Sequence, residues 1–251
     1  MLKITGKTIQ IKKEEQKKGE KREINNNNNN QNKDKKDRVR DYHHYSKSKV
    51  TSKKEAMVYV LVLGDIHIPT RAHQVPEKIK EVLLKSKDII QTIISTGNIC
   101  GRESYDFIRT ISNDIQSVRG DLDGGIGANF SASYPETKVI TIEGVKIGVC
   151  HGHQVVPWGD HDSLQGLQRR LNCDVLITGH THVPEIFKSD DDKLFINPGS
   201  LTGAYSPINP VSIPSFVLLE IKGDGKITCF FYKLVDDNIV VEKNVFENVK
   251  H

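Results

Sequence analysis

The chain has 251 residues with 36 Lys and Arg against 32 Asp and Glu, but residues 1–56 carry a net charge of +9 (17 basic, 8 acidic) and residues 57–251 a net charge of −5 (19 basic, 24 acidic). There is no apolar run of about 18 residues, which a spanning helix needs, and the first 30 residues lack the apolar core of a secretory signal. We therefore expect a soluble intracellular protein rather than a membrane or secreted one.

Residues 1–56 form a segment with its own composition. They include six consecutive Asn, Asn25 to Asn30, many Lys and few apolar side chains, so they cannot bury enough surface to offset the entropy lost on folding. We predict a disordered basic extension over 1–56. Most such tails are simply solvated, and binding to nucleic acid or to an anionic membrane is the alternative. Met57 directly precedes the first predicted strand, so Met1 and Met57 both stay open as the start of translation.

Regular structure is predicted from Met57 onward. Val58–Leu63 is a short, β-branched apolar run closed by Gly64, which is typical of a strand buried on both faces. Similar runs predict strands at Ile89–Ser95, Ile115–Val118, Lys138–Ile142, Val145–Cys150, Asp174–Thr178, Leu194–Ile196, Ser215–Ile221, Lys226–Leu234 and Ile239–Val245. Helical spacing of apolar residues predicts helices at Pro76–Leu84, Glu103–Ile111 and Asp160–Leu171.

The order of these elements indicates the fold class. Strands and helices alternate early, whereas strands dominate late, with predicted hairpin turns at Gly223-Asp224-Gly225 and Asp236-Asp237-Asn238. This pattern favours one layered α/β domain over residues 57–251, in which helices cover sheets, rather than a barrel or a helical bundle.

The cysteines indicate neither a disulfide framework nor a zinc finger. Cys100, Cys150, Cys173 and Cys229 are far apart in the sequence and lack the Cys-x-x-Cys spacing of a zinc or redox site. We expect reduced thiols in the core, as is usual for an intracellular protein.

Polar side chains suited to metal binding follow five of the predicted strands. The motifs are Gly64-Asp65-Ile66-His67, Thr96-Gly97-Asn98, Arg119-Gly120-Asp121-Leu122-Asp123, His151-Gly152-His153 and Gly179-His180-Thr181-His182. Functional groups of open α/β sheets collect where strands end, and several of these motifs contain a glycine that lets backbones approach closely. Asp, Asn and His together suit divalent zinc, manganese or iron, so we predict a metal site.

In this order the five motifs resemble the calcineurin-like metallophosphoesterases. The resemblance covers residues 57–246 and implies a four-layered α-β-β-α sandwich. It also implies a site in which two metal ions, about 3.5–4 Å apart, activate water at a phosphate ester. The ligands that it implies are Asp65, His67 and His182 for one ion and Asp121, His151 and His180 for the other, with Asn98 at the bridging position.

Longer stretches resemble one branch of this superfamily, the small subunits of the retromer coat. They are VLVLGDIHIP, STGNICGRESYDF, VRGDLD, GHQVVPWGD, TGHTH, INPGSLTGAY and IPSFVLLEI. Retromer is a cytosolic coat that retrieves membrane cargo from endosomes. The resemblance therefore implies a scaffold for endosome-to-Golgi transport that binds the large α-solenoid subunit of retromer and meets the endosome membrane only through the complex.

Three positions depart from the pattern of a hydrolytic enzyme. The bridging position, normally Asp, is Asn98; the usual Asn of the third motif is Asp121; and the next position, normally a His that protonates the leaving group, is Leu122. An alkyl chain cannot perform general-acid catalysis, which is typically worth about 10²–10⁴-fold in rate. We therefore expect no catalytic residue and a weakly or partially occupied zinc or manganese site. The alternative is a metal-dependent phosphodiesterase or phosphatase with a binuclear site.

Apolar residues in predicted loops indicate a protein-binding surface. Val155-Val156-Pro157-Trp158 follows the fourth motif, and Ile208 lies between two prolines. A free loop is usually polar, so exposed apolar groups there can mark a partner site, although Trp158 can equally pack under its own loop.

The resemblance also implies which residues contact partners. Val58, Val156 and Ile208 match a hydrophobic surface that receives regulatory proteins carrying hydrophobic, Pro-containing motifs. Ile66, Ile68 and Pro69 lie near the expected pocket mouth, where the α-solenoid would bind.

Overall fold

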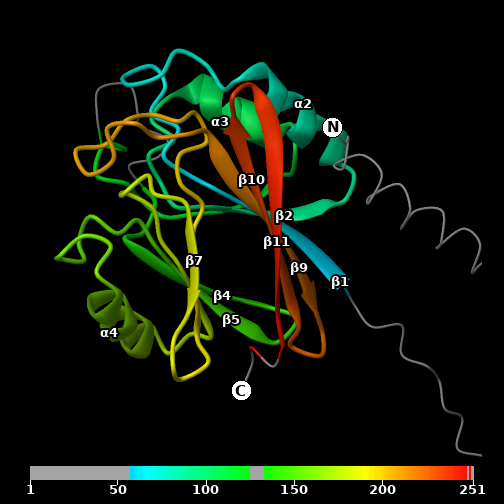
Figure 1. Ribbon diagram of the computed structural model, residues 1–251, viewed down its shortest axis with the longest axis vertical. Helices are drawn as coiled ribbons and strands as arrows, with labels where there is room; N and C mark the ends of the chain where they lie inside the picture. Colours follow the sequence, from blue (N-terminus) through cyan, green and yellow to red (C-terminus); the bar gives the residue numbers. More distant parts are fainter. Residues whose placement is uncertain (1–56, 125–132, 248, 250–251) are drawn as a thin grey trace, which may run out of the picture. The chain divides into compact units, whose positions relative to one another are not determined.

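The structure is a computed structural model and describes residues 57–124, 133–247 and 249 (Figure 1). The predicted disordered extension over 1–56 lies outside the described residues. Every predicted strand is present to within one residue of its expected bounds, and every predicted helix to within two. No helix of the described residues is long and apolar enough to cross a membrane.

The larger of two β-sheets has six strands in the order β11-β10-β9-β1-β2-β3. Its strands are β1 (Met57–Leu63), β2 (Ile90–Ser95), β3 (Asp114–Ser117), β9 (Ser215–Lys222), β10 (Ile227–Val235) and β11 (Asn238–Phe246). β1, β2 and β3 are parallel neighbours, whereas β9 pairs antiparallel with β1 and the last three strands pair antiparallel in turn. Asp236 and Asp237 form the two-residue turn between β10 and β11, and both have positive φ, which suits a tight hairpin.

The second sheet has five strands in the order β4-β5-β6-β8-β7. They are β4 (Thr137–Ile142), β5 (Val145–Cys150), β6 (Val175–Ile177), β7 (Glu185–Lys188) and β8 (Leu194–Asn197). β5, β6 and β8 are parallel, and β4 and β7 form the antiparallel edges. The sequence did not predict β7, because a four-residue edge strand with charged ends gives too little apolar alternation to be recognised.

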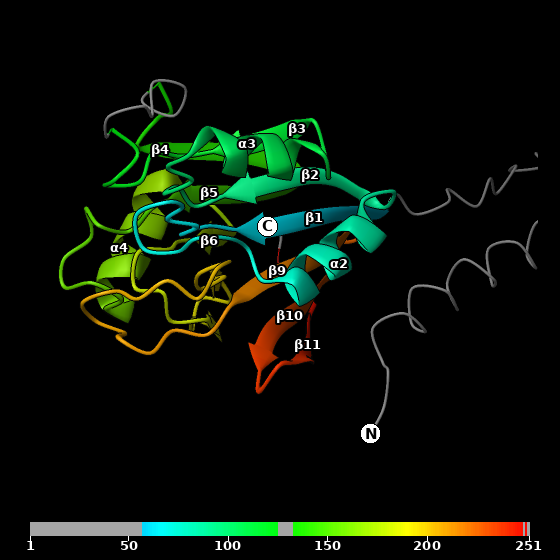
Figure 2. The same cartoon turned by 90° about the horizontal axis from the view of Figure 1, so that it is seen from above.

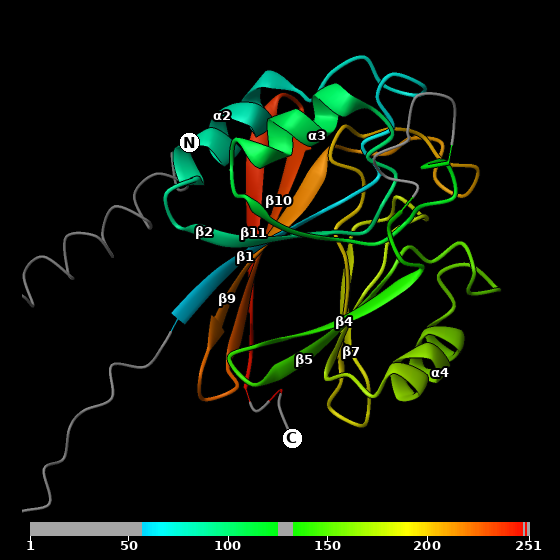
Figure 3. The same cartoon turned by 180° about the vertical axis from the view of Figure 1, so that it is seen from behind.

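In the described part of the chain, three helices cover the outer faces of the sheets: α2 (Glu77–Ser86), α3 (Arg102–Arg109) and α4 (His161–Leu171). Figure 3 shows α2 and α3 beside the six-stranded sheet and α4 beyond the five-stranded sheet. Separate apolar clusters fill the layers: Ile79 and Ile108 pack with the first sheet, and Leu164 and Leu167 with the second. The expected four-layered α-β-β-α arrangement is therefore present.

β1 has the two buried faces that its sequence predicts. Val60 and Val62 join the cluster between the two sheets, whereas Leu61 and Leu63 join the cluster beneath the helices. In Figure 2, β1 and β2 point toward the same side of the molecule, and the loops that follow them gather there. This edge carries the predicted polar motifs.

The cysteines are free thiols. Cys150, Cys173 and Cys229 are buried in the core as predicted, and burial raises the pKa of each thiol. Cys100 is only half-buried, in the loop that follows β2.

Candidate metal centre

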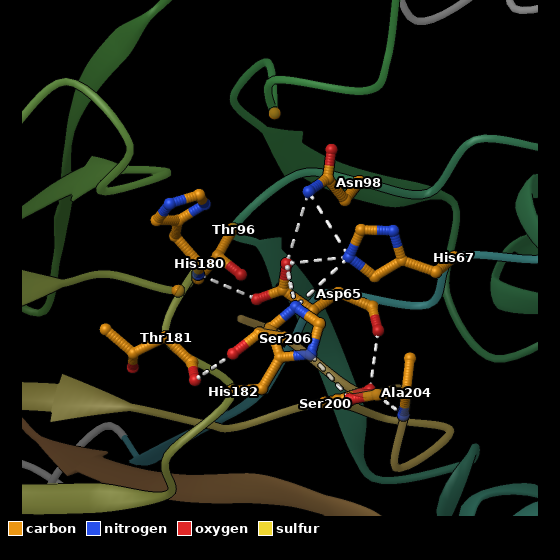
Figure 4. A network of polar contacts seen from close by, with 12 residues as sticks. Asp65, His67, Thr96, Asn98, His180, Thr181, His182, Ser200, Ala204 and Ser206 are labelled. Atoms are coloured by element: carbon orange, nitrogen blue, oxygen red, sulfur yellow. Dashed lines mark hydrogen bonds and ion pairs between the residues drawn. The ribbon is translucent and has the colours of Figure 1, made fainter. Parts of the chain in front are cut away.

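The predicted ligands lie together at the carboxyl ends of parallel strands from both sheets. Figure 4 shows Asp65, His67, Asn98, His180 and His182. Asp65 and His67 follow β1, Asn98 follows β2 and Asp121 follows β3. His151 follows β5, and His180 and His182 follow β6. Their metal-binding atoms form two groups, Asp65 with His67 and His182, and Asp121 with His151 and His180.

The first group, Asp65, His67 and His182, is buried and compact. His67 Nε2 and His182 Nε2 lie 3.4 and 3.3 Å from Asp65 Oδ1, and the two nitrogens are 3.1 Å apart. Two ligands of a tetrahedral zinc ion, each bonded at about 2.0–2.1 Å, lie about 3.3–3.4 Å from one another. The donor set and its spacing therefore fit a divalent ion of the zinc type.

The second group, Asp121, His151 and His180, is looser and more open. Asp121 Oδ1 lies 3.0 Å from His151 Nε2 but 3.8 Å from His180 Nδ1. The Asp121 side chain is 33% exposed, whereas His151 is fully buried. An ion here would face solvent on one side.

Asn98 lies between the groups, but its orientation differs from that of a bridging ligand. The side-chain nitrogen Nδ2 faces the pocket, 2.8 Å from Asp121 Oδ1 and 3.0 Å from His151 Nε2. The oxygen Oδ1 instead accepts a hydrogen bond from Leu122 N–H at 2.9 Å. An amide nitrogen has no lone pair free for a metal, so Asn98 in this orientation is a hydrogen-bond donor rather than the bridge that the resemblance implies.

Backbone carbonyls orient two of the histidines. His182 Nδ1 contacts the Ala204 carbonyl at 2.6 Å and His151 Nδ1 contacts the Thr96 carbonyl at 2.7 Å. Since a carbonyl only accepts, both Nδ1 atoms carry hydrogen, and in the neutral ring Nε2 keeps a lone pair for a metal. His67 Nδ1 is buried without a partner, so the orientation of that ring is less firmly fixed.

The electrostatics of the pocket favour bound cations. Burial by itself would raise the pKa of Asp65, but the surrounding histidines hold that pKa well below its usual range. Asp121 shows the same balance, with burial outweighed by hydrogen bonds that lower its pKa. Burial lowers the pKa of His67, which favours the neutral, ligating form. Burial alone would lower the pKa of His151, but the carboxylates of Asp65 and Asp121 raise it. Both carboxylates are thus anions, and of these two imidazoles that of His67 favours the neutral form.

The backbone of the pocket is unusually constrained. Five of the seven predicted ligands have a positive φ, which is uncommon outside glycine: Asp65, His67, Asn98, His180 and His182. Left-handed residues that cluster in this way are typical of functional loops whose geometry the surrounding fold enforces.

Several residues that position the pocket were not singled out from the sequence. Ser200 Oγ donates to the Asp65 carbonyl at 2.7 Å, and Thr202 Oγ1 donates to the Ile66 carbonyl at 2.8 Å. Asp123 is fully buried and accepts hydrogen bonds from the backbone N–H groups of Asn98 and Gly120. Their only signal in the sequence was a place within a quoted motif or stretch, without an assigned role.

Apolar side chains are exposed on the loops after β5 and before β9, as the loop sequences predict. Val156 is 74% exposed and Ile208 is 44% exposed. Trp158 is partly packed: its Nε1 donates to the His153 carbonyl at 3.0 Å and its ring contacts His180 edge-on, yet 45% of the residue remains accessible. Both alternatives for this residue therefore hold in part.

Two of the predicted partner-binding residues, Ile66 and Val58, are less accessible than the exposed loop residues. Ile66 is fully buried in the core, so its side chain is not available to a partner, whereas Ile68 is half-buried and Pro69 is exposed. Val58 is half-buried near the amino end of β1, about 20 Å of extended chain from Asp65. Val58 thus lies at the opposite end of β1 from the loop that carries Asp65.

The chain resembles known proteins over most of the domain. Residues 57–224 match the calcineurin-like phosphoesterase superfamily domain. Vacuolar protein sorting-associated protein 29 of Schizosaccharomyces pombe is 34% identical over 189 residues, which cover 73% of this chain and 95% of the relative.

Solved structures agree with this match. The zinc complex of the same protein from Entamoeba histolytica is 44% identical, with a TM-score of 0.68, and the match covers 76% of this chain and 100% of that one. The Cryptosporidium parvum structure is 38% identical with a TM-score of 0.70, covering 76% and 99%. The chain thus belongs to the calcineurin-like phosphoesterase superfamily and is a homologue of vacuolar protein sorting-associated protein 29.

Proposed function

We propose that this protein is a non-catalytic scaffold subunit of a retromer-type coat. In this role it binds the large α-solenoid subunit, vacuolar protein sorting-associated protein 35, during endosome-to-Golgi transport of membrane proteins. The observation that carries the proposal is the match to 95% of the length of the Schizosaccharomyces pombe sorting protein. The protein would work in the cytoplasm and reach the endosome membrane through the complex.

The apolar rim of the pocket supports a protein partner. Val156, Trp158 and Ile208 expose apolar surface beside a buried, charged pocket. Apolar side chains grouped on loops around a polar centre are typical of protein interfaces, where aromatic residues often contribute most of the binding energy. We assign this rim, with Ile68 and Pro69, to the α-solenoid.

Regulatory proteins with hydrophobic, Pro-containing motifs are the second proposed class of partner. Val58 lies near the opposite end of β1 from the pocket and packs only partly against the core. A regulator that used Val58 would therefore bind a different face from the rim and need not compete with the α-solenoid.

A divalent ion would have a structural role in this proposal. Asp65, His67 and His182 come from two loops, and an ion bound by all three would hold those loops together. Zinc is favoured by the spacing of the donors and by the zinc complex of the Entamoeba relative. Leu122 supplies no proton donor, which supports a scaffold rather than an enzyme.

The test is affinity purification of the protein from its own cells at near-physiological salt, with mass spectrometry of the proteins recovered in near-equal amount. We expect to recover a large helical-repeat protein, at about one copy for each copy of this chain. Recovery of the protein alone would overturn the scaffold assignment.

The alternative function is a metal-dependent phosphodiesterase or phosphatase, and the two groups of metal-type ligands favour it. Its test is hydrolysis of an activated phosphodiester with manganese. Activity that Asp65→Ala abolishes would support the enzyme, whereas equal rates in both proteins would indicate a contaminant.

A further inference from the structure

We propose that Arg71 is the charged anchor of the surface assigned to the α-solenoid subunit, and that it binds an Asp or Glu side chain of that partner. The inference rests on the proposed scaffold function and deepens it, because it names a chemical group that the partner must bring. The apolar side chains of the rim do not by themselves select any such group.

Arg71 lies where the pocket meets the residues assigned to the partner. It follows Pro69 by two residues in the loop between β1 and α2, and its backbone N–H donates to the carbonyl of His67 at 2.8 Å. Its side chain reaches the loop between β8 and β9, where Nη1 donates to the Tyr205 carbonyl at 3.2 Å. Tyr205 lies three residues before Ile208. One arginine thus joins two loops that both carry residues of the proposed interface.

The guanidinium of Arg71 is oriented, but most of its hydrogen-bond donors are unused. Its Cζ atom lies 5.2 Å from the centroid of the Tyr205 ring, within the range of a cation–π contact. A guanidinium has five N–H donors, and in the described part of the chain the Tyr205 carbonyl engages one of them. The remaining donors suit a carboxylate, which arginine binds through two parallel N–H bonds. Tyr205 is 56% exposed, so a partner can reach this stacked pair.

The charge of Arg71 is not neutralised by the described ranges 57–124 and 133–247, where no Asp or Glu forms an ion pair with it. The pocket carboxylates are engaged elsewhere: Asp65 is fully buried beside His67, and Asp121 contacts His151 at 3.0 Å. Burial is the main reason that the pKa of His67 is lowered, and the charge of Arg71 adds to that effect. This is what an uncompensated cation beside the pocket is expected to do.

Docking of a partner would take this charge out of water. Ile68 and Pro69 precede Arg71 on one loop and Ile208 follows Tyr205 on the other, so a partner that covers them also covers the stacked pair. A charge that loses its water without gaining a partner is strongly unfavourable, and apolar contacts do not replace its hydrogen bonds. A carboxylate of the partner supplies both the charge and the acceptors, whereas a basic group at the same place would be repelled.

The first test is calorimetric titration of the full-length chain with purified vacuolar protein sorting-associated protein 35. Arg71→Gln should weaken binding by at least about tenfold, with an unchanged melting temperature by circular dichroism. Arg109→Gln is the matched control, because Arg109 also stacks on a tyrosine, Tyr105 at 5.8 Å, but lies on α3. It should bind like the wild type.

The second test identifies the group that Arg71 meets. Arg71→Lys places an amine there, and a carbodiimide joins an amine to a carboxylate only when the two are in contact. We expect an amide cross-link between position 71 and an Asp or Glu of the α-solenoid, located by mass spectrometry of the digested complex. Arg109→Lys should give no cross-link to the partner.

The outcomes separate the inference from the function on which it rests. Equal affinity of the wild type and Arg71→Gln would overturn the inference and leave the scaffold function intact. Weaker binding without a cross-link from position 71 to an acidic residue would also overturn it, since Arg71 would then contact another kind of group. Failure of the wild-type chain to bind the α-solenoid would instead overturn the scaffold function.

Discussion

Asp123 Oδ2 accepts a hydrogen bond from the backbone N–H of Asn98 at 2.7 Å, so a buried carboxylate from the loop after β3 holds the loop after β2 in place. The same oxygen accepts from Gly120 N–H at 2.8 Å, and Oδ1 accepts from Cys100 N–H at 3.1 Å. One side chain thus satisfies three backbone donors around the pocket.

Asp123→Asn should destabilise the fold, because the new amide places a donor against at least one of these N–H groups. Leaving a buried donor unpaired costs about 1–3 kcal/mol in the free energy of unfolding, measurable by urea denaturation. Asp106→Asn is the matched control: it breaks an exposed pair with Arg102, worth about 0–1 kcal/mol. Equal losses in the two variants would refute the role given to Asp123.

Asp65→Asn should weaken zinc binding strongly, because it removes the only anion of the buried group. We expect at least a tenfold rise in the dissociation constant, measured by competition with a chromophoric chelator. His161→Gln is the control, since His161 stacks on Phe187 outside both ligand groups. Zinc affinity unchanged by Asp65→Asn would show that the ion binds elsewhere.

Hydrolysis of an activated phosphodiester with manganese should be at background level in the wild-type protein. Leu122 lies at the pocket but offers no proton donor, and Asn98 offers no bridging carboxylate. The double variant Asn98→Asp/Leu122→His should hydrolyse faster, within the roughly 10²–10⁴-fold range of general-acid catalysis. A wild-type rate that matches the double variant would mean that another group supplies the proton.

Val156→Asp should weaken binding to the α-solenoid subunit, because it places a charge in the apolar rim. The side chain is 74% exposed, so the melting temperature should change little. Val240→Asp serves as the control, since Val240 is 42% exposed and lies on β11 rather than on a pocket loop. Binding is measured by calorimetric titration with the α-solenoid subunit. If both variants bind it as tightly as the wild type does, the rim is not part of the interface.

Helix α4 should show a measurable pH dependence at its first turn. Asp160 caps the helix by accepting a hydrogen bond from Ser163 N–H at 2.9 Å, and its contacts with Ser163 lower the pKa of the carboxyl group. A lowered folded pKa means that this stabilisation is present above the unfolded value of about 3.9 and is lost as the pH falls through the folded value. Asn also caps helices but does not titrate there. Asp160→Asn should therefore show a flatter melting temperature between about pH 2.5 and 5 than the wild type; parallel curves would contradict this assignment.

The sequence determined the helices, the strands other than β7 and the order of the pocket motifs, because each depends on local periodicity or on a few adjacent residues. β1 shows this well, since an unbroken apolar run predicted the two buried faces that Val60 and Leu61 occupy. Resemblance then supplied the two groups of ligands, which the folded chain brings together.

Only the tertiary structure decided which atoms of those ligands face one another. Asn98 was expected to bridge two ions, but the direction of its amide depends on Leu122 N–H, which comes from a different strand end. The burial of Ile66 likewise depends on how layers stack rather than on neighbouring residues. Hydrogen-bond direction and surface continuity arise from contacts between distant segments, so no local pattern in the sequence encodes them.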